Sequence, residues 1–148
     1  SIANMIGYWK NPDATKECMN EEGWFKSGDV GKFEGPLLFI SDRIKDMVIR
    51  GGENIACPEV ESAIYQHPEV LEACVFGIPD ERLGELLCTA IYLRNESNAT
   101  EDSIREFLST KLAAFKIPAV IEFVSEPLPK LASGKFDKPT LRKIYAIN

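Results

Sequence analysis

Leu71–Phe76 (LEACVF) and Leu86–Leu93 (LLCTAIYL) are two nearly apolar runs separated by a segment rich in turn residues. Short apolar runs bounded by turn signals are typical of strands buried inside a domain. Gly77-Ile78-Pro79 predicts the end of the first strand, and Asp80–Gly84 predicts a loop or one helical turn before the second. These two runs therefore predict the centre of a small sheet.

Further strands and helices flank these two runs. Met47–Ile49 predicts a short strand closed by two glycines, and Val120–Val124 predicts another strand. Helix starts are predicted at Pro58, Thr100 and Pro139. Strands interleaved with helices over roughly 100 residues predict a small α+β domain, in which helices cover one face or both of a short mixed sheet.

The first part of the chain, residues 1–41, has a different character. It is rich in turn residues, predicts no helix, and contains two short strands, at Phe33 and Leu37–Ile40, around the turn Glu34-Gly35-Pro36. A segment with exposed aromatic residues and no helix does not form its own core, so we interpret it as the tail of a larger domain. The charged cluster 42–46 (DRIKD) predicts the boundary, which leaves 47–148 as the second domain.

Composition excludes several classes of function. Of the 148 residues, 45% are hydrophobic and 27% are charged, the usual mix of a soluble globular protein. The net charge of −6 disfavours non-specific binding to nucleic acid or to an anionic membrane, since both require a basic face. No apolar run approaches the roughly 20 residues that span a bilayer, and no signal-peptide pattern is present. We therefore expect a cytoplasmic protein without a transmembrane segment.

The cysteines and the histidine predict neither a metal site nor a disulfide framework. Cys18, Cys57, Cys74 and Cys88 show no CxxC spacing, and a thiol within an apolar run behaves as a small hydrophobic residue. We expect buried free thiols, which fit a reducing compartment. His67, the one histidine, precedes a proline at the predicted end of a helix and is interpreted as structural.

A short loop near the C-terminus presents one lysine. Residues 127–136 (PLPKLASGKF) combine two prolines, which restrict φ, with Gly134, which can adopt backbone conformations closed to other residues. Lys135 is then a cation held at a defined place, suited to a reaction in which a carboxylate meets a phosphoryl group. Glycine followed by lysine also occurs in many ordinary surface turns, so this pattern is weak by itself.

Four stretches together resemble the C-terminal portion of the adenylate-forming, AMP-binding enzymes: acyl- and aryl-CoA ligases, carrier-protein adenylation domains and luciferases. They are Gly23–Gly31 (GWFKSGDVG), Asp42–Ile55, Pro58–Glu61 (PEVE) and the Lys135 loop. The resemblance covers essentially the whole chain, in family order and spacing. The glycine pair at 51–52 resembles acyl-CoA ligases more than carrier-protein adenylation domains.

The resemblance implies an AMP-forming acid–thiol ligase. Its substrates would be a carboxylic acid, ATP with Mg²⁺, and CoA, with no residue of this chain identified as a ligand of Mg²⁺. The acid attacks the α-phosphate to give an acyl-adenylate, and the CoA thiol then displaces AMP to give a thioester. A fatty or related organic acid is the leading substrate class.

Three residues match the family's adenylation chemistry. Lys135 matches the lysine that bridges the carboxylate and the nucleotide, and it stays protonated near neutral pH. Asp29 matches the aspartate that accepts hydrogen bonds from the ribose hydroxyls. Arg43 matches a second nucleotide contact, although a surface salt bridge to Asp42 or Asp46 is the structural alternative.

Other residues match the hinge and the CoA site. Lys45 matches the hinge about which the small domain swings between the two half-reactions. Gly51 and Gly52 match the loop that lines the pantetheine tunnel, with an ordinary turn as the alternative. Lys116 lies where some relatives contact CoA phosphates, whereas its neighbour Phe115 is interpreted as core packing.

Two alternatives remain open at this point: a carrier-protein-loading adenylation domain and a non-catalytic CoA-binding or interaction module. The chain shows no Ser/Thr/Gly-rich phosphate loop and no acyl pocket, features that the family places in its large N-terminal domain. We therefore expect that domain of the same polypeptide to be its partner, and we expect no turnover by the chain alone.

Overall fold

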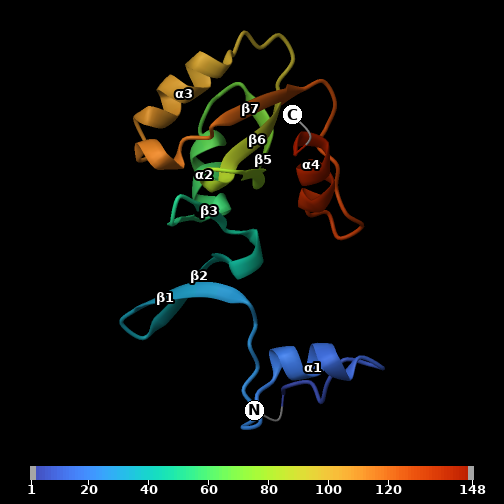
Figure 1. Ribbon diagram of the computed structural model, residues 1–148. Coiled ribbons are helices and arrows are strands. Elements are labelled where there is room, and N and C mark those ends of the chain that lie inside the picture. The colour runs from blue at the N-terminus through green and yellow to red at the C-terminus, as the bar shows by residue number, and fades with distance from the viewer. Residues whose placement is uncertain (1–2, 147–148) are drawn as a thin grey trace. The chain divides into compact units, whose positions relative to one another are not determined.

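The computed structural model describes residues 3–146 and divides the chain into two compact units, Ser1–Ile44 and Lys45–Asn148 (Figure 1). The first unit contains helix α1 (Pro12–Cys18) and the antiparallel strands β1 (Asp29–Glu34) and β2 (Leu37–Arg43). No residue from 3 to 44 is buried. Trp9, Phe33 and Leu37 remain at least 60% exposed, so this unit has no hydrophobic core of its own within the described part.

Helix α1 corrects the prediction that the first forty residues contain no helix. The Asn11 side chain accepts a hydrogen bond from the Ala14 N–H at 3.1 Å and so caps the helix. Pro12 occupies the first turn, where its missing N–H costs nothing. An Asn-Pro-Asp start signal was therefore present, and only the shortness of the helix concealed it.

The second unit is built around a mixed sheet. Its strands are β3 (Val48–Arg50), β4 (Glu53–Ile55), β5 (Val70–Asp80), β6 (Gly84–Leu93) and β7 (Val120–Val124). The order is β4-β3-β6-β5, with β7 also paired to β6. The β6–β7 pairing is parallel and the others are antiparallel, which confirms the predicted short mixed sheet.

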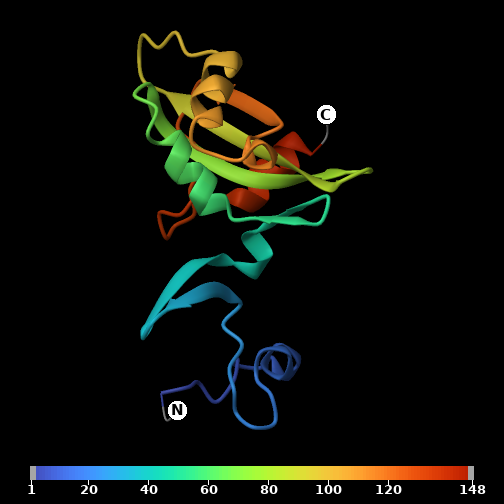
Figure 2. The same ribbon diagram turned by 90° about the vertical axis from the view of Figure 1, so that its left-hand side faces the viewer.

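Helices cover both faces of this sheet, as Figures 1 and 2 show. Helices α2 (Cys57–Ile64) and α3 (Glu101–Ser109) pack on one face, and α4 (Lys138–Tyr145) packs on the other. Short 3-10 helices span Ile44–Asp46 and Ala114–Lys116. Thr100 caps α3 in a capping box with Ser103, as its predicted position before the helix requires.

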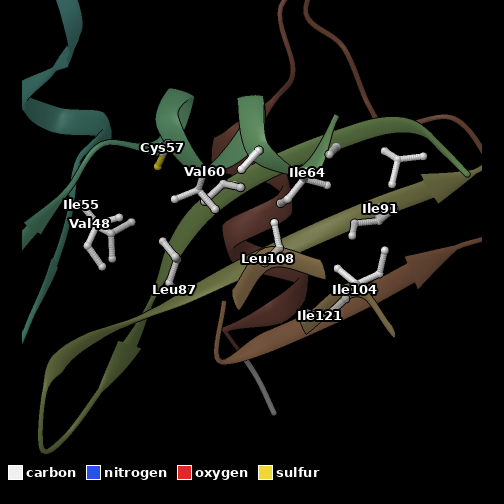
Figure 3. Close-up of a cluster of buried hydrophobic side chains, with 14 residues drawn as sticks. Val48, Ile55, Cys57, Val60, Ile64, Leu87, Ile91, Ile104, Leu108 and Ile121 are labelled. Carbon is white, nitrogen blue, oxygen red and sulfur yellow. The ribbon is translucent and has the colours of Figure 1, made fainter. Parts of the chain in front are cut away.

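Each face has its own hydrophobic cluster. Figure 3 shows the larger cluster, in which α2 and α3 contribute Val60, Ile64, Ile104 and Leu108 against Leu87, Ile91 and Ile121 of the sheet. The smaller cluster joins the opposite face to α4 and contains Cys74, Phe76, Ile78, Cys88, Ala90, Leu128 and Leu141. Strands β5 and β6 supply both clusters because their side chains alternate between the two faces.

Strand β5 is longer than predicted. It continues through Gly77 and Pro79 to Asp80 and forms a tight hairpin with β6, in which Pro79 faces Glu85 and Asp80 faces Gly84. Proline is tolerated here because β5 pairs only with β6 and is therefore an edge strand. The predicted loop reduces to three residues, 81–83, and strand β4 was not predicted.

Replacement of Ile91 tests the larger cluster. Ile91 is fully buried on the central strand β6, so we expect Ile91→Ala to lower the free energy of unfolding by about 2–5 kcal/mol, through lost burial and a residual cavity. Urea unfolding followed by circular dichroism measures this, because Trp9 and Trp24 both lie in the first unit. The control Leu71→Ala, at a 43% exposed side chain, is expected to cost less than about 1 kcal/mol; equal losses would contradict the assignment.

Candidate functional site

The Lys135 loop is a short hairpin between β7 and α4. The Asp137 N–H donates to the Pro129 carbonyl at 2.8 Å, Lys130 and Phe136 form an isolated bridge, and the Leu131 N–H donates to the Lys135 carbonyl at 2.8 Å. Gly134 has φ of +81°, a left-handed conformation that other residues rarely adopt. Lys135 is exposed, and its ammonium forms no salt bridge within residues 3–146.

A carboxylate of β5 holds the beginning of this loop. Glu72 accepts the Leu128 N–H at 2.9 Å through one oxygen and the Lys130 ammonium at 2.5 Å through the other. Burial opposes ionisation of Glu72, but these two donors outweigh it and lower the pKa of Glu72 below its ordinary value. Leu128 itself is buried in the smaller cluster, so both backbone and side chain fix this point.

A second carboxylate holds the end of the loop. Asp137 caps α4 by accepting the Thr140 N–H at 3.1 Å. The next residue, Lys138, forms a salt bridge of 3.0 Å with Glu61 of α2, and the same oxygen of Glu61 accepts the Val75 N–H of β5 at 2.9 Å. Burial disfavours the charged form of Lys138, yet its pKa is raised overall by nearby groups that include the Glu61 carboxylate.

The two candidate nucleotide residues are cross-strand neighbours in the first unit. Asp29 on β1 faces Arg43 on β2 in the register, and the Arg43 Nε lies 3.5 Å from the Asp29 carboxylate. The salt bridge is therefore to Asp29, where the alternative reading placed it on Asp42 or Asp46. Ser27 contributes through its hydroxyl, which accepts the Asp29 N–H at 3.2 Å. The structure brings these two candidates together.

Gly51 and Gly52 form the two-residue turn of the β3–β4 hairpin. Both have positive φ, +57° and +88°, as a tight hairpin turn of this kind requires. The hairpin is held to the β5–β6 turn, because the Gly51 N–H donates to the Leu83 carbonyl at 2.8 Å and the Ile49 N–H donates to Glu85 at 2.7 Å. The glycines therefore have a structural role whether or not they also line a tunnel.

Lys45 and Lys116 lie elsewhere in the second unit. Lys45 is exposed, in the 3-10 helix Ile44–Asp46, and it is the first residue after the division between the two units. Lys116 is not a freely presented cation, since Glu59 holds it at 2.6 and 2.7 Å. Its neighbour Phe115 packs against the larger cluster, which agrees with the predicted core role.

The cysteines and the histidine have structural surroundings. None of the four cysteines forms a disulfide; Cys57, Cys74 and Cys88 are buried, and Cys18 is half-buried. Burial raises the pKa of Cys74 and of Cys88 to about 12, so these thiols are poor nucleophiles. The His67 ring contacts the Phe107 ring edge-on at 4.9 Å between centroids, which fits its predicted structural role.

Sequence reasoning missed the residues that brace the Lys135 loop: Glu61, Glu72, Lys130 and Lys138. Glu61 and Lys130 lie inside the quoted motifs, but their contacts could not be read from them, because Glu72 meets Leu128 and Lys130 across 56 and 58 residues of sequence. One signal was present, because Glu72 interrupts an apolar strand. A carboxylate in such a place requires a partner.

No group of His, Cys, Asp and Glu side chains within residues 3–146 is arranged to hold a metal ion. Across the same described range, every helix is too short or too polar to cross a bilayer. A hollow of about 190 Å³ lies between the start of the Lys135 loop and α4, and none of the candidate site residues lines it.

Comparison with known proteins agrees with the fold and with the expected family. Residues 59–135 match the family model of the AMP-binding enzyme C-terminal domain. The chain is 45% identical over 145 residues to probable acyl-activating enzyme 9 of Arabidopsis thaliana, covering 95% of this chain and 26% of that protein. It is 40% identical over 140 residues to long-chain-fatty-acid–CoA ligase FadD13 of Mycobacterium tuberculosis (strain H37Rv), covering 94% and 27%.

Among solved structures, ATP-bound MatB of Rhodopseudomonas palustris matches with a TM-score of 0.88 at 34% identity, covering 96% of this chain and 28% of that one. The chain belongs to the AMP-binding enzyme C-terminal domain family, as its sequence motifs predicted. It spans about a quarter of the length of the curated relatives that it matches, 26–27% for the two named here.

The lowered pKa of Glu72 predicts a pH-dependent contribution to stability. A carboxyl whose pKa is lower in the folded state stabilises the fold above its ordinary pKa of 4.5 and loses that contribution as the pH falls through the folded value. We expect Glu72→Gln to destabilise the chain by about 1 kcal/mol at neutral pH. This difference should shrink in the pH range below 4.5, the ordinary pKa of the carboxyl, as the pH falls through the lower folded-state value.

Urea unfolding of both proteins across this pH range measures the difference. The control Glu101→Gln removes an exposed carboxylate that pairs with Arg105 at 3.4 Å, and we expect it to change stability little at any pH. A difference for Glu72→Gln that stays constant down to the lowest pH would contradict the assigned ion pair.

Proposed function

We propose that this chain is the C-terminal part of an ATP-dependent carboxylic acid–CoA ligase, which forms an acyl-adenylate and then an acyl-CoA thioester. The main support is the similarity along 94–95% of the chain to proteins named as acyl-activating enzymes and acyl-CoA ligases. An exposed, braced lysine at the position of the family's adenylation lysine gives the proposal its chemistry.

In the first half-reaction, Lys135 would stabilise the developing negative charge. The attacking carboxylate and the α-phosphate of ATP, bound as its Mg²⁺ complex, repel one another as they approach. A protonated lysine placed between their oxygens offsets this repulsion, and a fixed position raises its effect because little reorganisation is needed during the reaction. Lys135 acts by charge and position, not as a base.

Asp29 and Arg43 would bind the nucleotide. An ionised carboxylate only accepts hydrogen bonds, and its two oxygens match the two hydroxyls of a ribose cis-diol. The contact with Arg43 keeps Asp29 oriented across the β1–β2 pair. Planar guanidinium groups present several donors in a fixed geometry, so Arg43 can bind a nucleotide oxygen as well.

A hinge at 42–46, centred on Lys45, would let the second domain, 47–148, serve both half-reactions. The compact units divide between Ile44 and Lys45, inside this segment. Within the second unit, the β3–β4 hairpin with Gly51 and Gly52 and the loop that precedes α4 lie on different sides in both Figures 1 and 2. A rotation about Lys45 would turn the Lys135 face of the second domain away from the bound substrate and bring the β3–β4 hairpin to it. The pantetheine arm of CoA would then pass along this hairpin.

Lys116 would contact a phosphate of CoA in the second half-reaction. Its ammonium is bound by Glu59, so a phosphate must displace or share that carboxylate. A group with two negative charges competes well against one carboxylate for an ammonium, since charge-assisted hydrogen bonds strengthen with the charge of the acceptor. The Glu59 pair would hold Lys116 in place until CoA arrives.

The remaining parts of the proposal concern the whole enzyme. A larger N-terminal domain would cover the exposed apolar side chains of residues 3–44 and would supply the phosphate loop and the acyl pocket. A fatty or related organic acid is the proposed substrate class, supported by the names of the relatives. The absence of a disulfide among the four cysteines fits the proposal of a cytoplasmic enzyme.

The replacement Lys135→Ala in the enzyme that contains this chain tests the central role. We expect adenylate formation from acid and ATP to fall by about 100- to 1000-fold, because one preorganised charge is lost. Thioester formation from a supplied acyl-adenylate and CoA should be nearly unchanged. Single-turnover measurements of each half-reaction separate the two steps, with Lys143→Ala, an exposed lysine of α4, as the control.

Equal losses in both half-reactions would contradict the role of Lys135. A non-catalytic CoA-binding module would instead show micromolar CoA binding to the 148-residue chain by calorimetry, with no effect of Lys135 on any turnover. Transfer of the acyl group to a carrier protein in preference to CoA would favour the carrier-loading alternative.

Replacement of Asp29 tests nucleotide binding. We expect Asp29→Asn to weaken ATP binding by about tenfold to a hundredfold, because a charged acceptor is replaced by a neutral amide. The matched control is Glu34→Gln, which removes a carboxylate of the same strand that pairs with Lys32 at 2.6 Å. Isothermal titration with a non-hydrolysable ATP analogue measures both; similar affinities for the two variants would overturn the assignment of Asp29.

A further inference from the structure

Both ends of the Lys135 loop are attached to the same strand. At the beginning of the loop, Glu72 of β5 binds the Leu128 N–H and the Lys130 ammonium. The Glu72 side chain is 18% exposed and the Lys130 side chain is 43% exposed, so the carboxylate is the more shielded member of the pair. The Lys130 ammonium also lies 5.5 Å from the centre of the Phe136 ring, on the opposite arm of the hairpin.

At the end of the loop, the attachment passes around the outer edge of β5. Glu61 of α2 accepts the Val75 N–H, which no neighbouring strand can pair because β5 is at the edge of the sheet. The same oxygen binds Lys138, the first residue of α4. Both members of this pair are about 20% exposed, so the link between α2, β5 and α4 is held in a poorly solvated place.

These two attachments leave little freedom to the residues between them. Hydrogen bonds between Pro129 and Asp137 and between Leu131 and Lys135 join its two arms. Glu72 fixes the first arm to β5 at Leu128, and Glu61 links Lys138, which follows the second arm, to the Val75 N–H of β5. The Lys135 backbone is thus positioned by groups that do not contact Lys135 itself. A displacement of about 1 Å in a reacting arrangement can cost on the order of 100-fold in rate, so this bracing has a chemical consequence.

We propose that Glu72 and Glu61 are positioning residues for the adenylation half-reaction. Glu72 binds the Leu128 N–H and the Lys130 ammonium at the start of the Lys135 loop, and Glu61 joins the Lys138 ammonium at its end to the Val75 N–H of β5. Glu72 thereby connects the loop to β5, and Glu61 connects α4 to β5. Hydrogen bonds to a carboxylate are directional, so they fix the orientation of the connected segments more closely than apolar packing alone would. The proposal rests on the proposed function, and it adds two residues that would control how accurately the cation is delivered.

The experiment uses the enzyme that contains this chain, with Glu72→Gln and Glu61→Gln. Glutamine keeps the shape of the side chain but loses the charge that holds the ammonium groups. We expect about a tenfold loss in adenylate formation for each variant. We expect less than about a twofold change in thioester formation from a supplied acyl-adenylate. A purely structural role would lower both rates together.

A matched control is available at Glu69, the residue just before β5. Glu69 accepts hydrogen bonds from the Asn98 and Ala99 N–H groups and from the Ser97 hydroxyl, and none of these three donors belongs to the Lys135 loop. Glu69→Gln is expected to lower the melting temperature as much as Glu72→Gln without changing the ratio of the two half-reactions. If Glu72→Gln fails to fold, Lys130→Gln removes the other partner at a 43% exposed side chain and should give the same selective loss.

Lys135→Ala in the same assays separates the proposed function from the positioning role of the two carboxylates. A selective adenylation defect in Lys135→Ala, together with normal ratios in Glu72→Gln, Glu61→Gln and Lys130→Gln, would overturn the positioning role alone. An unaffected adenylation rate in Lys135→Ala would overturn the proposed function and this inference with it.

Discussion

The attachment of the Lys135 loop to strand β5 is the constraint on which the proposed chemistry depends. A lysine side chain is long and flexible, so its ammonium is useful in a transition state only if the backbone beneath it is held. Glu72 holds that backbone at the Leu128 N–H, and Glu61 holds the end of the loop through the Lys138 ammonium. The two carboxylate side chains are 18% and 20% exposed, a degree of burial at which a carboxylate without a cationic partner would be unfavourable. The same contacts satisfy the outward N–H of Val75 on an edge strand.

The sheet explains why this constraint can be met. Strands β5 and β6 form a long hairpin whose side chains feed two hydrophobic clusters, and helices cover both faces. The hairpin is therefore rigid, and the elements attached to it are fixed relative to one another within the second unit. The first unit contributes the Asp29–Arg43 pair, so the proposed chemistry divides between two compact units that meet at Ile44 and Lys45.

Much of the fold follows from local sequence signals. The apolar runs at 71–76 and 86–93 predicted the central strands, and Thr100 and Pro139 predicted the starts of two helices, because capping and periodicity act over a few residues. The predicted end of β5 was wrong. Pro79 can belong to the strand only because β5 is an edge strand, and the order of strands in a sheet cannot be read from local sequence. Helix α1 was missed because its seven residues are too few to show an apolar periodicity.

The candidate site could be predicted only in part. Lys135, Asp29, Arg43, Lys45, Gly51, Gly52 and Lys116 were found through family motifs, and their roles remain predictions. The partner of Arg43 and the partner of Lys116 could not be predicted, because Asp29 and Glu59 come next to them only after β1 pairs with β2 and α2 packs near the 3-10 helix. The contacts that Glu72 and Glu61 make around the Lys135 loop could not be predicted for the same reason, since Glu72 meets Leu128 across 56 residues of sequence.

The most direct measurement is a crystal structure of the enzyme that contains this chain, with an acyl-adenylate bound and no CoA present. We expect the Lys135 ammonium within hydrogen-bond distance, about 3 Å, of an oxygen at the acyl–phosphate junction. We also expect Glu72 to bind the Leu128 N–H in that complex. An adenylate seated in a closed site with the Lys135 ammonium in bulk solvent would contradict the role of Lys135, and a loop detached from β5 while the lysine contacts the adenylate would contradict the role of Glu72.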